Sequence, residues 1–181
     1  ALQLPNSPPI IGIPVCTLTT DEITPERVAP LLDQPQTLIL LESKGANPVA
    51  DWRWGFTQLR RLGVSAPILL RRIYETTDLD LFRLYAAADC GSIFLDGWGN
   101  GLALEAPHIS PEEIIKTEFG ILQAARLRMS KTEFISCPGC GRTLYDLQST
   151  IAEIKAATAH LKGLKVGIMG CIVNGPGEMA D

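Results

Sequence analysis

Three cysteines toward the C-terminal end of the chain have the residue type and spacing of metal ligands. Cys137 and Cys140 form a CxxC pair around Pro138 and Gly139, and Cys171 follows further along the chain. The two residues inside a CxxC pair turn the backbone, so both sulfurs can point at one metal centre. Proline fixes φ and glycine admits positive φ, which suits such a turn.

The number of candidate ligands is unusual for a structural metal site. Structural zinc sites normally close with four Cys or His ligands, and ordinary iron–sulfur clusters use four cysteines. The nearest histidine is His160, which lies inside a helical pattern and away from the cysteine motifs. Three thiols without an evident fourth ligand indicate an iron–sulfur cluster in which one iron is not bound by cysteine. That iron can take a non-cysteine ligand and take part in a reaction. A redox disulfide and a zinc knuckle are the alternatives.

The segments SCPGCGR at 136–142 and MGCIVNGPGE at 169–178 resemble the C-terminal region of the (E)-4-hydroxy-3-methylbut-2-enyl diphosphate synthase family. Members of this family are iron–sulfur enzymes of the non-mevalonate isoprenoid pathway. The joint occurrence of the two motifs at this separation is specific, whereas a lone CxxC pair is not. The resemblance implies a [4Fe–4S] cluster with the ligands Cys137, Cys140, Cys171 and Glu178.

The resemblance also implies a reaction, the reductive ring opening and dehydration of 2-C-methyl-D-erythritol 2,4-cyclodiphosphate. Reduced ferredoxin or flavodoxin would donate the electrons, and the cluster would pass them singly and bind a substrate oxygen. Glu178 then acts as an exchangeable oxygen ligand that the substrate displaces. Asn174 has two interpretations: it hydrogen-bonds the substrate near the cluster, or it forms a left-handed turn before Gly175.

Two functions from other classes stay open. The chain could be an autonomous iron–sulfur electron-transfer module, which needs a fourth protein ligand that stays in place. It could also be a zinc-stabilised interaction domain. The metal content after anaerobic reconstitution distinguishes these hypotheses.

Composition restricts the partners of the chain. Its 181 residues are 46% hydrophobic and 20% charged, with a net charge of −4, which fits one or two packed domains. The negative charge disfavours nucleic-acid binding, and no apolar run reaches the length that spans a bilayer.

The N-terminal segment lacks a signal-peptide pattern. Five cysteines, three of them in metal-like spacing, favour a reducing compartment. A cytoplasmic location is predicted, or the plastid stroma if the source is a plant.

Apolar runs alternate with helical patterns in the first part of the chain. The patterns predict strands at 10–15, 37–42, 67–74 and 92–96, and helices at 25–32, 48–62, 79–88 and 111–128. Such alternation indicates a parallel sheet covered by helices, and four units of this kind are half of a (β/α)₈ barrel. Ser110 is expected to cap the last of these helices, and Gly63 to end the second.

The last part of the chain predicts a smaller βαβ unit. We expect a strand at 132–136, a helix at 144–161 and a strand at 165–169. The helix would turn an apolar stripe to the sheet, made of Leu144, Leu147, Ile151, Ile154 and Leu161. Parallel strands end together, so this topology predicts both cysteine loops at one sheet edge.

The expected fold class is therefore α/β, with two domains. Residues 1–129 form a partial (β/α)-barrel-like region, and residues 130–181 a small α/β iron–sulfur domain. Large members of the family carry a barrel-like insertion, which the segment 75–101 resembles. The missing initiator Met and the ending at Asp181 suggest a fragment, truncated at its C-terminus. The family's N-terminal barrel, which binds the substrate diphosphate, is absent, so the fragment alone is expected to be inactive.

Several other residue types could do chemistry but have simpler interpretations. Glu42, Glu75 and Asp96 are predicted at strand ends, where barrel enzymes keep catalytic groups, yet helix capping and loop hydrogen bonds are the favoured roles. Cys16 and Cys90 lie in apolar contexts and are expected to be buried thiols.

Overall fold

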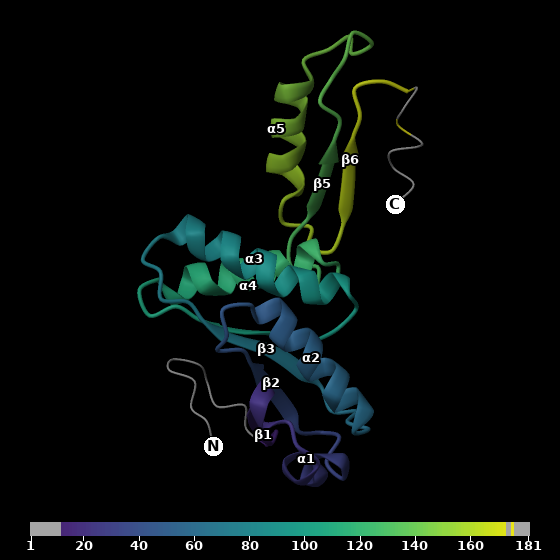
Figure 1. Cartoon of the computed structure of the whole chain (residues 1–181). Coiled ribbons are helices and arrows are strands. Elements are labelled where there is room, and N and C mark those ends of the chain that lie inside the picture. The colour runs from purple at the N-terminus through teal and green to yellow at the C-terminus, as the bar shows by residue number, and fades with distance from the viewer. Residues whose placement is uncertain (1–11, 173–174, 176–181) are drawn as a thin grey trace. The chain divides into compact units, whose positions relative to one another are not determined.

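The chain divides into two compact units between Leu127 and Arg128. The computed structural model describes residues 12–172 and residue 175 (Figure 1), so Asn174 and Glu178 lie outside the described residues. The fold is α/β, as predicted, and each unit has its own parallel sheet. No helix in the described part of the chain is both long and apolar enough to cross a membrane.

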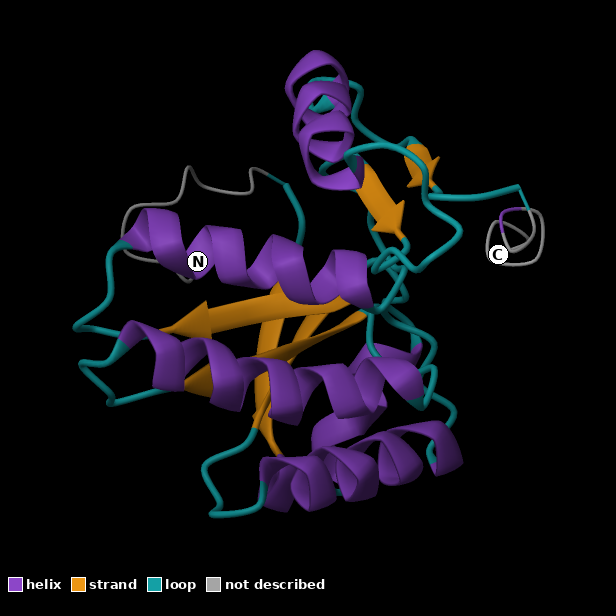
Figure 2. Ribbon diagram, turned by 90° about the horizontal axis from the view of Figure 1, so that it is seen from above, coloured by secondary structure: helices purple, strands orange, loops and turns teal. Residues whose placement is uncertain are grey.

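The first unit consists of four successive βα pairs (Figures 1 and 2). Its elements are β1 (Val15–Thr19), a 3-10 turn η1 (Thr20–Glu22), α1 (Pro25–Leu32), β2 (Leu38–Glu42), α2 (Pro48–Arg61), β3 (Ile68–Ile73), α3 (Leu79–Leu95), β4 (Gly101–Glu105) and α4 (Pro111–Ala124). All four strands are parallel, and their order in the sheet is β1-β2-β3-β4. An order without reversal is that of consecutive strands in a (β/α) barrel, whereas a doubly wound sheet reverses its order.

The core of the first unit lies between the sheet and its helices. Leu18, Leu41 and Leu70 occupy one register row of β1, β2 and β3, and all three are fully buried. Trp52 on α2 is also fully buried, and its Nε1 donates to the carbonyl of Leu41 at 2.9 Å. A Cβ on Gly55 would lie 3.2 Å from Leu41 Cδ2 and from Thr20 Cγ2. Glycine at this position therefore lets α2 approach the sheet closely.

Local signals at the helix ends are confirmed. Ser110 caps α4, because its hydroxyl accepts a hydrogen bond from the N–H of Glu113 at 3.4 Å. Thr24 caps α1 in the same way, with the N–H of Arg27 at 3.3 Å. Gly63 follows the end of α2 with φ +82°, the conformation that favours glycine at this position.

The predicted strand at 92–96 is wrong, because residues up to Leu95 belong to α3. The fully buried side chains of Phe82, Ala86, Cys90 and Ile93 recur at helical spacing and form one apolar face. A short apolar run does not distinguish a strand from the last turn of a helix. The fourth strand is instead β4, which follows the glycine-rich loop after α3.

Two further predicted boundaries differ from the structure. The first strand was expected at 10–15 and is observed at Val15–Thr19, where it pairs with Leu38–Glu42; residues 10 and 11 lie outside the described residues. The β-branched threonines of this segment suit an extended strand. The helix expected to reach residue 128 ends at Ala124, and Arg126 adopts a left-handed φ of +59°.

The second unit is the predicted βαβ unit. It consists of β5 (Glu133–Ser136), α5 (Leu147–Thr158) and β6 (Lys165–Ile168), and β5 and β6 are parallel. Its small core consists of Leu147, Ile151 and Ile168, with Phe134, Cys137, Ile154 and Val166 packed against them. Buried Thr132 places its hydroxyl 3.0 Å from the carbonyl oxygen of Thr158, the last residue of α5, which ties the start of β5 to the end of the helix.

The helix of this unit is shorter than expected. Asp146 caps its N-terminus by accepting from the N–H groups of Gln148 and Ser149. Leu144 therefore lies outside the helix and is 93% exposed, which contradicts its predicted place on the apolar stripe. A side chain that caps a helix sets its first residue, and the apolar spacing alone does not.

The edge strand β4 is closed by a carboxylate. The N–H of Leu104 donates to Glu118 Oε1 of α4 at 2.8 Å. On the other side of β4, the carbonyl of Glu105 accepts from the N–H of Tyr74, which follows β3. Desolvation raises the pKa of Glu118 above its ordinary value of 4.5, and the hydrogen bond from Leu104 opposes this only partly. A carboxylate at this edge occupies an N–H that would otherwise be free to pair with another strand.

The raised pKa of Glu118 predicts a pH-dependent stability difference. The folded chain binds this proton more tightly than the unfolded chain, so the wild-type chain loses stability as the pH rises from about 4.5 through the folded pKa. Glu118→Gln keeps an oxygen for Leu104 but cannot ionise. The free energy of unfolding of the variant minus that of the wild type should therefore increase between about pH 4 and about pH 7. Urea unfolding at several pH values measures this, and a difference that stays constant or decreases contradicts the prediction.

Candidate functional site

Parallel pairing of β5 with β6 brings both cysteine segments to one end of the second sheet (Figure 1). Ser136 and Ile168 are register partners at the ends of the two strands. Cys137 follows directly, and its N–H donates to the carbonyl of Ile168 at 3.3 Å. Cys171 comes three residues after β6 ends. The predicted shared sheet edge of the two cysteine loops is confirmed.

The two loops touch at the sulfur of Cys137. The backbone N–H of Gly170, the residue before Cys171, donates to Cys137 Sγ at 3.1 Å. Cys137 is half-buried and packs against the small core of the unit. Hydrogen bonds to sulfur are among the features by which a protein tunes an iron–sulfur site. The contact therefore brings one predicted ligand next to the loop that carries another.

The CxxC segment forms a turn of the expected kind. Gly139 has a φ of +83°, which an L-residue with a side chain rarely adopts. The N–H of Thr143 donates to the carbonyl of Cys140 at 2.9 Å, and the hydroxyl of Thr143 accepts from the N–H of Cys140 at 3.3 Å. Cys140 itself is exposed. The turn thus presents one half-buried and one accessible thiol.

Sequence reasoning missed two residues that join the loops. Thr143 lies against Gly170, because a Cβ on that glycine would be 2.4 Å from Thr143 Oγ1. The hydroxyl of Tyr145 donates to the carbonyl of Met169 at 2.8 Å. Both residues follow the CxxC pair closely, yet nothing in their own spacing shows that they contact a loop more than twenty residues away.

The donor set fits an iron–sulfur cluster in its chemistry. No cysteine in the described part of the chain forms a disulfide bond. Among residues 12–172 and 175, no group of three or more His, Cys, Asp or Glu side chains is gathered closely enough to hold a metal ion. The fourth predicted ligand, Glu178, and its neighbour Asn174 are outside that range. Two contacting loops that carry three thiols, with an N–H on one sulfur, suit a thiolate-held cluster.

His160 of the second unit is not placed to bind a metal together with the cysteines. His160 is exposed and follows the C-terminal end of α5, whereas the cysteine loops adjoin the N-terminal end. A helix of this length separates its two ends by about 18 Å. His160 is therefore too far from the cysteines to complete a zinc site in the described arrangement.

Acidic residues of the first unit are used in ion pairs. The guanidinium of Arg71 contacts the carboxylates of Glu42 and Glu105, the latter at 2.6 Å. Asp96, expected at a strand end, instead follows α3 and accepts from Arg53 Nε at 2.7 Å. Glu75 is exposed in the loop after β3. These partners favour structural roles over catalytic ones.

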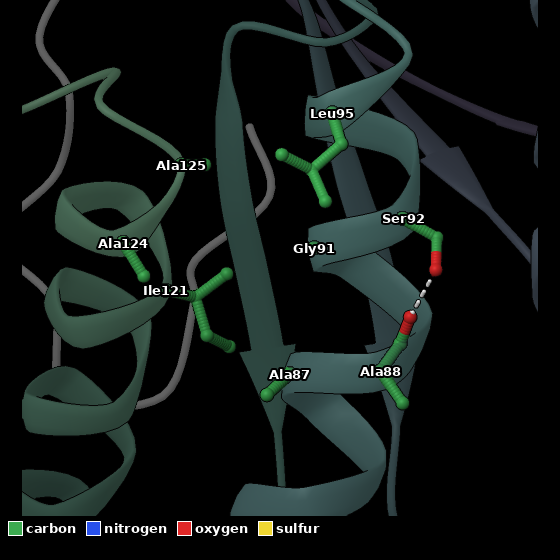
Figure 3. Close-up of a pocket in the computed structure, with 8 residues that line it drawn as sticks. All are labelled: Ala87, Ala88, Gly91, Ser92, Leu95, Ile121, Ala124 and Ala125. Carbon is green, nitrogen blue, oxygen red and sulfur yellow. Dashed lines mark hydrogen bonds between the residues drawn. The ribbon is translucent and has the colours of Figure 1, made fainter.

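A groove between α3 and α4 also lacks catalytic groups. It has a volume of about 360 Å³ and is lined by Ala87, Ala88, Gly91, Ser92, Leu95, Ile121, Ala124 and Ala125 (Figure 3). The hydroxyl of Ser92 donates to the carbonyl of Ala88 at 2.6 Å, within its own helix. No titratable side chain lines this groove.

The two remaining cysteines belong to the first unit. Cys90 is fully buried, as predicted, and burial raises the pKa of its thiol. Cys16 is only half-buried, so the expectation of a buried thiol is met in part. Neither residue lies in a cysteine-rich loop.

Comparison with protein families matches residues 133–181 to the GcpE protein C-terminal domain. These residues begin with β5 and include both cysteine loops. The resemblance inferred from the two cysteine motifs is thereby confirmed.

Curated relatives extend the similarity of this chain beyond residues 133–181. A protein of Porphyromonas gingivalis is 54% identical over 165 residues, which are 91% of this chain and 28% of the relative. A protein of Protochlamydia amoebophila is 44% identical over 173 residues, or 94% of this chain and 25% of the relative. Both are named 4-hydroxy-3-methylbut-2-en-1-yl diphosphate synthase (flavodoxin). The chain spans less than a third of the length of these relatives.

Thiol burial predicts an order of alkylation in the metal-free chain. Exposed Cys140 should react first with iodoacetamide, whereas Cys90 should react at least about 100-fold more slowly, since its reaction needs opening of the core. Mass spectrometry of the proteolytic peptides measures each rate. Comparable rates for Cys90 and Cys140 in the folded chain would show that the first unit is not packed as described.

Proposed function

We propose that this chain is the iron–sulfur part, with the adjoining (β/α) region, of a 4-hydroxy-3-methylbut-2-en-1-yl diphosphate synthase. The observation that carries the proposal is the contact of the two cysteine loops at the end of the β5–β6 sheet, through Gly170 and Cys137 Sγ. The GcpE-type domain and the relatives' printed names support it. The division of the chain into domains at 1–129 and 130–181 is part of the same proposal.

The proposed cofactor is a [4Fe–4S] cluster held by Cys137, Cys140, Cys171 and Glu178. When bound, such a cluster supplies single electrons and a Lewis-acidic iron. Three thiolates are soft ligands suited to iron–sulfur sites, and a carboxylate is a harder ligand that a substrate oxygen can replace. The half-buried position of Cys137 shields one sulfur from water, and the exposed position of Cys140 leaves an approach to the site.

The proposed reaction opens the ring of 2-C-methyl-D-erythritol 2,4-cyclodiphosphate by reduction and releases water. The names of the relatives specify the product and flavodoxin, so we assign flavodoxin or ferredoxin as the electron donor. Asn174 is proposed to hydrogen-bond the substrate beside the site. A location in the cytoplasm, or in the plastid stroma for a plant source, follows from the same assignment.

An electron-transfer module and a zinc-stabilised domain are the competing functions. Anaerobic reconstitution with iron and sulfide, followed by metal analysis, decides among them. About four irons and four sulfides per chain support the proposed cluster. One tightly bound zinc in place of iron would overturn it. The full-length parent protein with an assembled cluster is then mixed with the cyclic diphosphate. A spectrum of the cluster that does not change favours the electron-transfer module.

Ligand substitutions should separate Glu178 from the cysteines. Ala at Cys137, Cys140 or Cys171 should abolish stable cluster assembly, because each removes one anionic sulfur from a set of three. Glu178→Ala should still assemble a cluster, with an altered electron paramagnetic resonance spectrum, since water can occupy the vacated iron. Cys16→Ala, outside both loops, is the matched control and should assemble normally. A Glu178→Ala spectrum identical to that of the parent would remove Glu178 from the site.

The chain alone should lack turnover even when its cluster is assembled. Recognition of a diphosphate needs converging Arg or Lys donors, and Arg53, Arg71 and Arg83 in the first unit are each paired with carboxylates. Product formation with a chemical reductant should appear only when the remaining parent sequence is supplied. Detectable product from the isolated chain would contradict this, and a reconstituted full-length parent is the positive control.

A further inference from the structure

Three residues outside the ligand set hold the two cysteine loops against each other. We propose that Thr143, Tyr145 and Gly170 are positioning residues that form an interloop clamp before any metal enters. The clamp would hold the loop that carries Cys137 against the loop that carries Cys171. This inference rests on the iron–sulfur site proposed above and adds the residues that pre-arrange it.

Thr143 connects the CxxC turn with the second loop. Its Oγ1 accepts from the N–H of Cys140 at 3.3 Å, so the hydroxyl is oriented by the turn. The same oxygen would be 2.4 Å, and Thr143 Cγ2 3.2 Å, from a Cβ placed on Gly170. The threonine side chain therefore packs directly on the backbone of the second loop.

Gly170 is required by this close packing. A Cβ at position 170 would also lie 3.3 Å from Cys137 Sγ. Without a Cβ, the backbone N–H of Gly170 approaches that sulfur to 3.1 Å and donates to it. Any larger residue would separate the two loops or move the sulfur of a predicted ligand.

Tyr145 forms the second connection. Its hydroxyl donates to the carbonyl of Met169 at 2.8 Å, one residue before Gly170. The tyrosine ring is about half exposed, with 46% of its surface accessible. A tyrosine that contributes little to the core and spans two loops serves their relative position more than the packing of the unit.

The clamp has a thermodynamic consequence for metal binding. Ligand loops that are already in contact lose less conformational entropy when they close on a metal. Residues that orient ligands typically change metal affinity by about 10- to 100-fold. The clamp residues should therefore affect affinity although none of them supplies a ligand.

Anaerobic titration of the metal-free 181-residue chain with Co²⁺ tests this, since the sulfur-to-cobalt charge-transfer absorption reports thiolate binding directly. Thr143→Val, which keeps the shape but loses the acceptor, and Tyr145→Phe should each weaken Co²⁺ binding by about tenfold. Gly170→Ala should weaken it by up to about 100-fold. Thr143→Ser restores the hydroxyl and should bind within about threefold of the parent.

Matched controls come from the first unit. Tyr85→Phe changes a half-exposed tyrosine of α3, and Gly120→Ala adds a Cβ where no heavy atom lies within 4 Å. Both should bind Co²⁺ like the parent. The midpoint of global unfolding should be the same for Thr143→Val and Thr143→Ser. A difference in Co²⁺ affinity between two equally stable variants then reports the position of the ligands and not the stability of the fold.

Hydrogen exchange of the metal-free chain supplies a second measurement. The amides of Gly170 and Cys140 should be protected in the parent, and Thr143→Val should expose the amide of Cys140. Unprotected amides at both positions in the parent would overturn the clamp. Clamp variants that bind Co²⁺ as tightly as the parent would also overturn it and leave the cluster site standing. A parent that binds neither Co²⁺ nor iron would refute the cluster site, and the exchange data would still decide whether the loops are joined.

Discussion

Parallel pairing of two four-residue strands determines where the candidate site is. Because β5 and β6 run in the same direction, the segments that follow them leave the sheet at one end, and each carries a cysteine motif. An antiparallel pair would place the motifs at opposite ends. The crossover helix α5 makes the parallel arrangement possible, and its capping by Asp146 leaves the CxxC turn outside the helix. The interloop contacts of Thr143 and Gly170 follow from this geometry.

The two units differ in the size of their own hydrophobic cores. The first buries a large connected core that includes Trp52 and Phe82, whereas the buried core in the described part of the second is small, with Leu147, Ile151 and Ile168. A metal that joins two loops contributes most where the core is small, since metal binding and folding are coupled. The second unit is therefore the part of the chain whose stability should depend on the proposed cofactor.

Charged groups at the carboxyl ends of the first sheet form a network in place of an open site. Arg71 on β3 joins Glu42 on β2 with Glu105 on β4, so one guanidinium links three neighbouring strands. A paired and half-buried guanidinium of this kind fixes strand positions and is costly to separate from its partners. This arrangement and the apolar groove, which no titratable side chain lines, leave the cysteine loops as the candidate site that we propose.

Much of this fold could be predicted from local sequence. The helix at Pro25–Leu32, the cap at Ser110, the glycine after α2 and the βαβ order of the second unit could be predicted, because caps, glycines and apolar spacing act over a few residues. The cysteine motifs also carried the resemblance to the family whose C-terminal domain matches residues 133–181. Tertiary structure alone decided the rest. Residues 92–95 are helical because Ile93 and Phe94 join the buried core that contains Phe82 and Cys90. Leu144 is exposed because Asp146 caps the helix that begins after it. The contact of Thr143 with Gly170 needs strand register between distant segments, and register is set by pairing partners that no single segment contains.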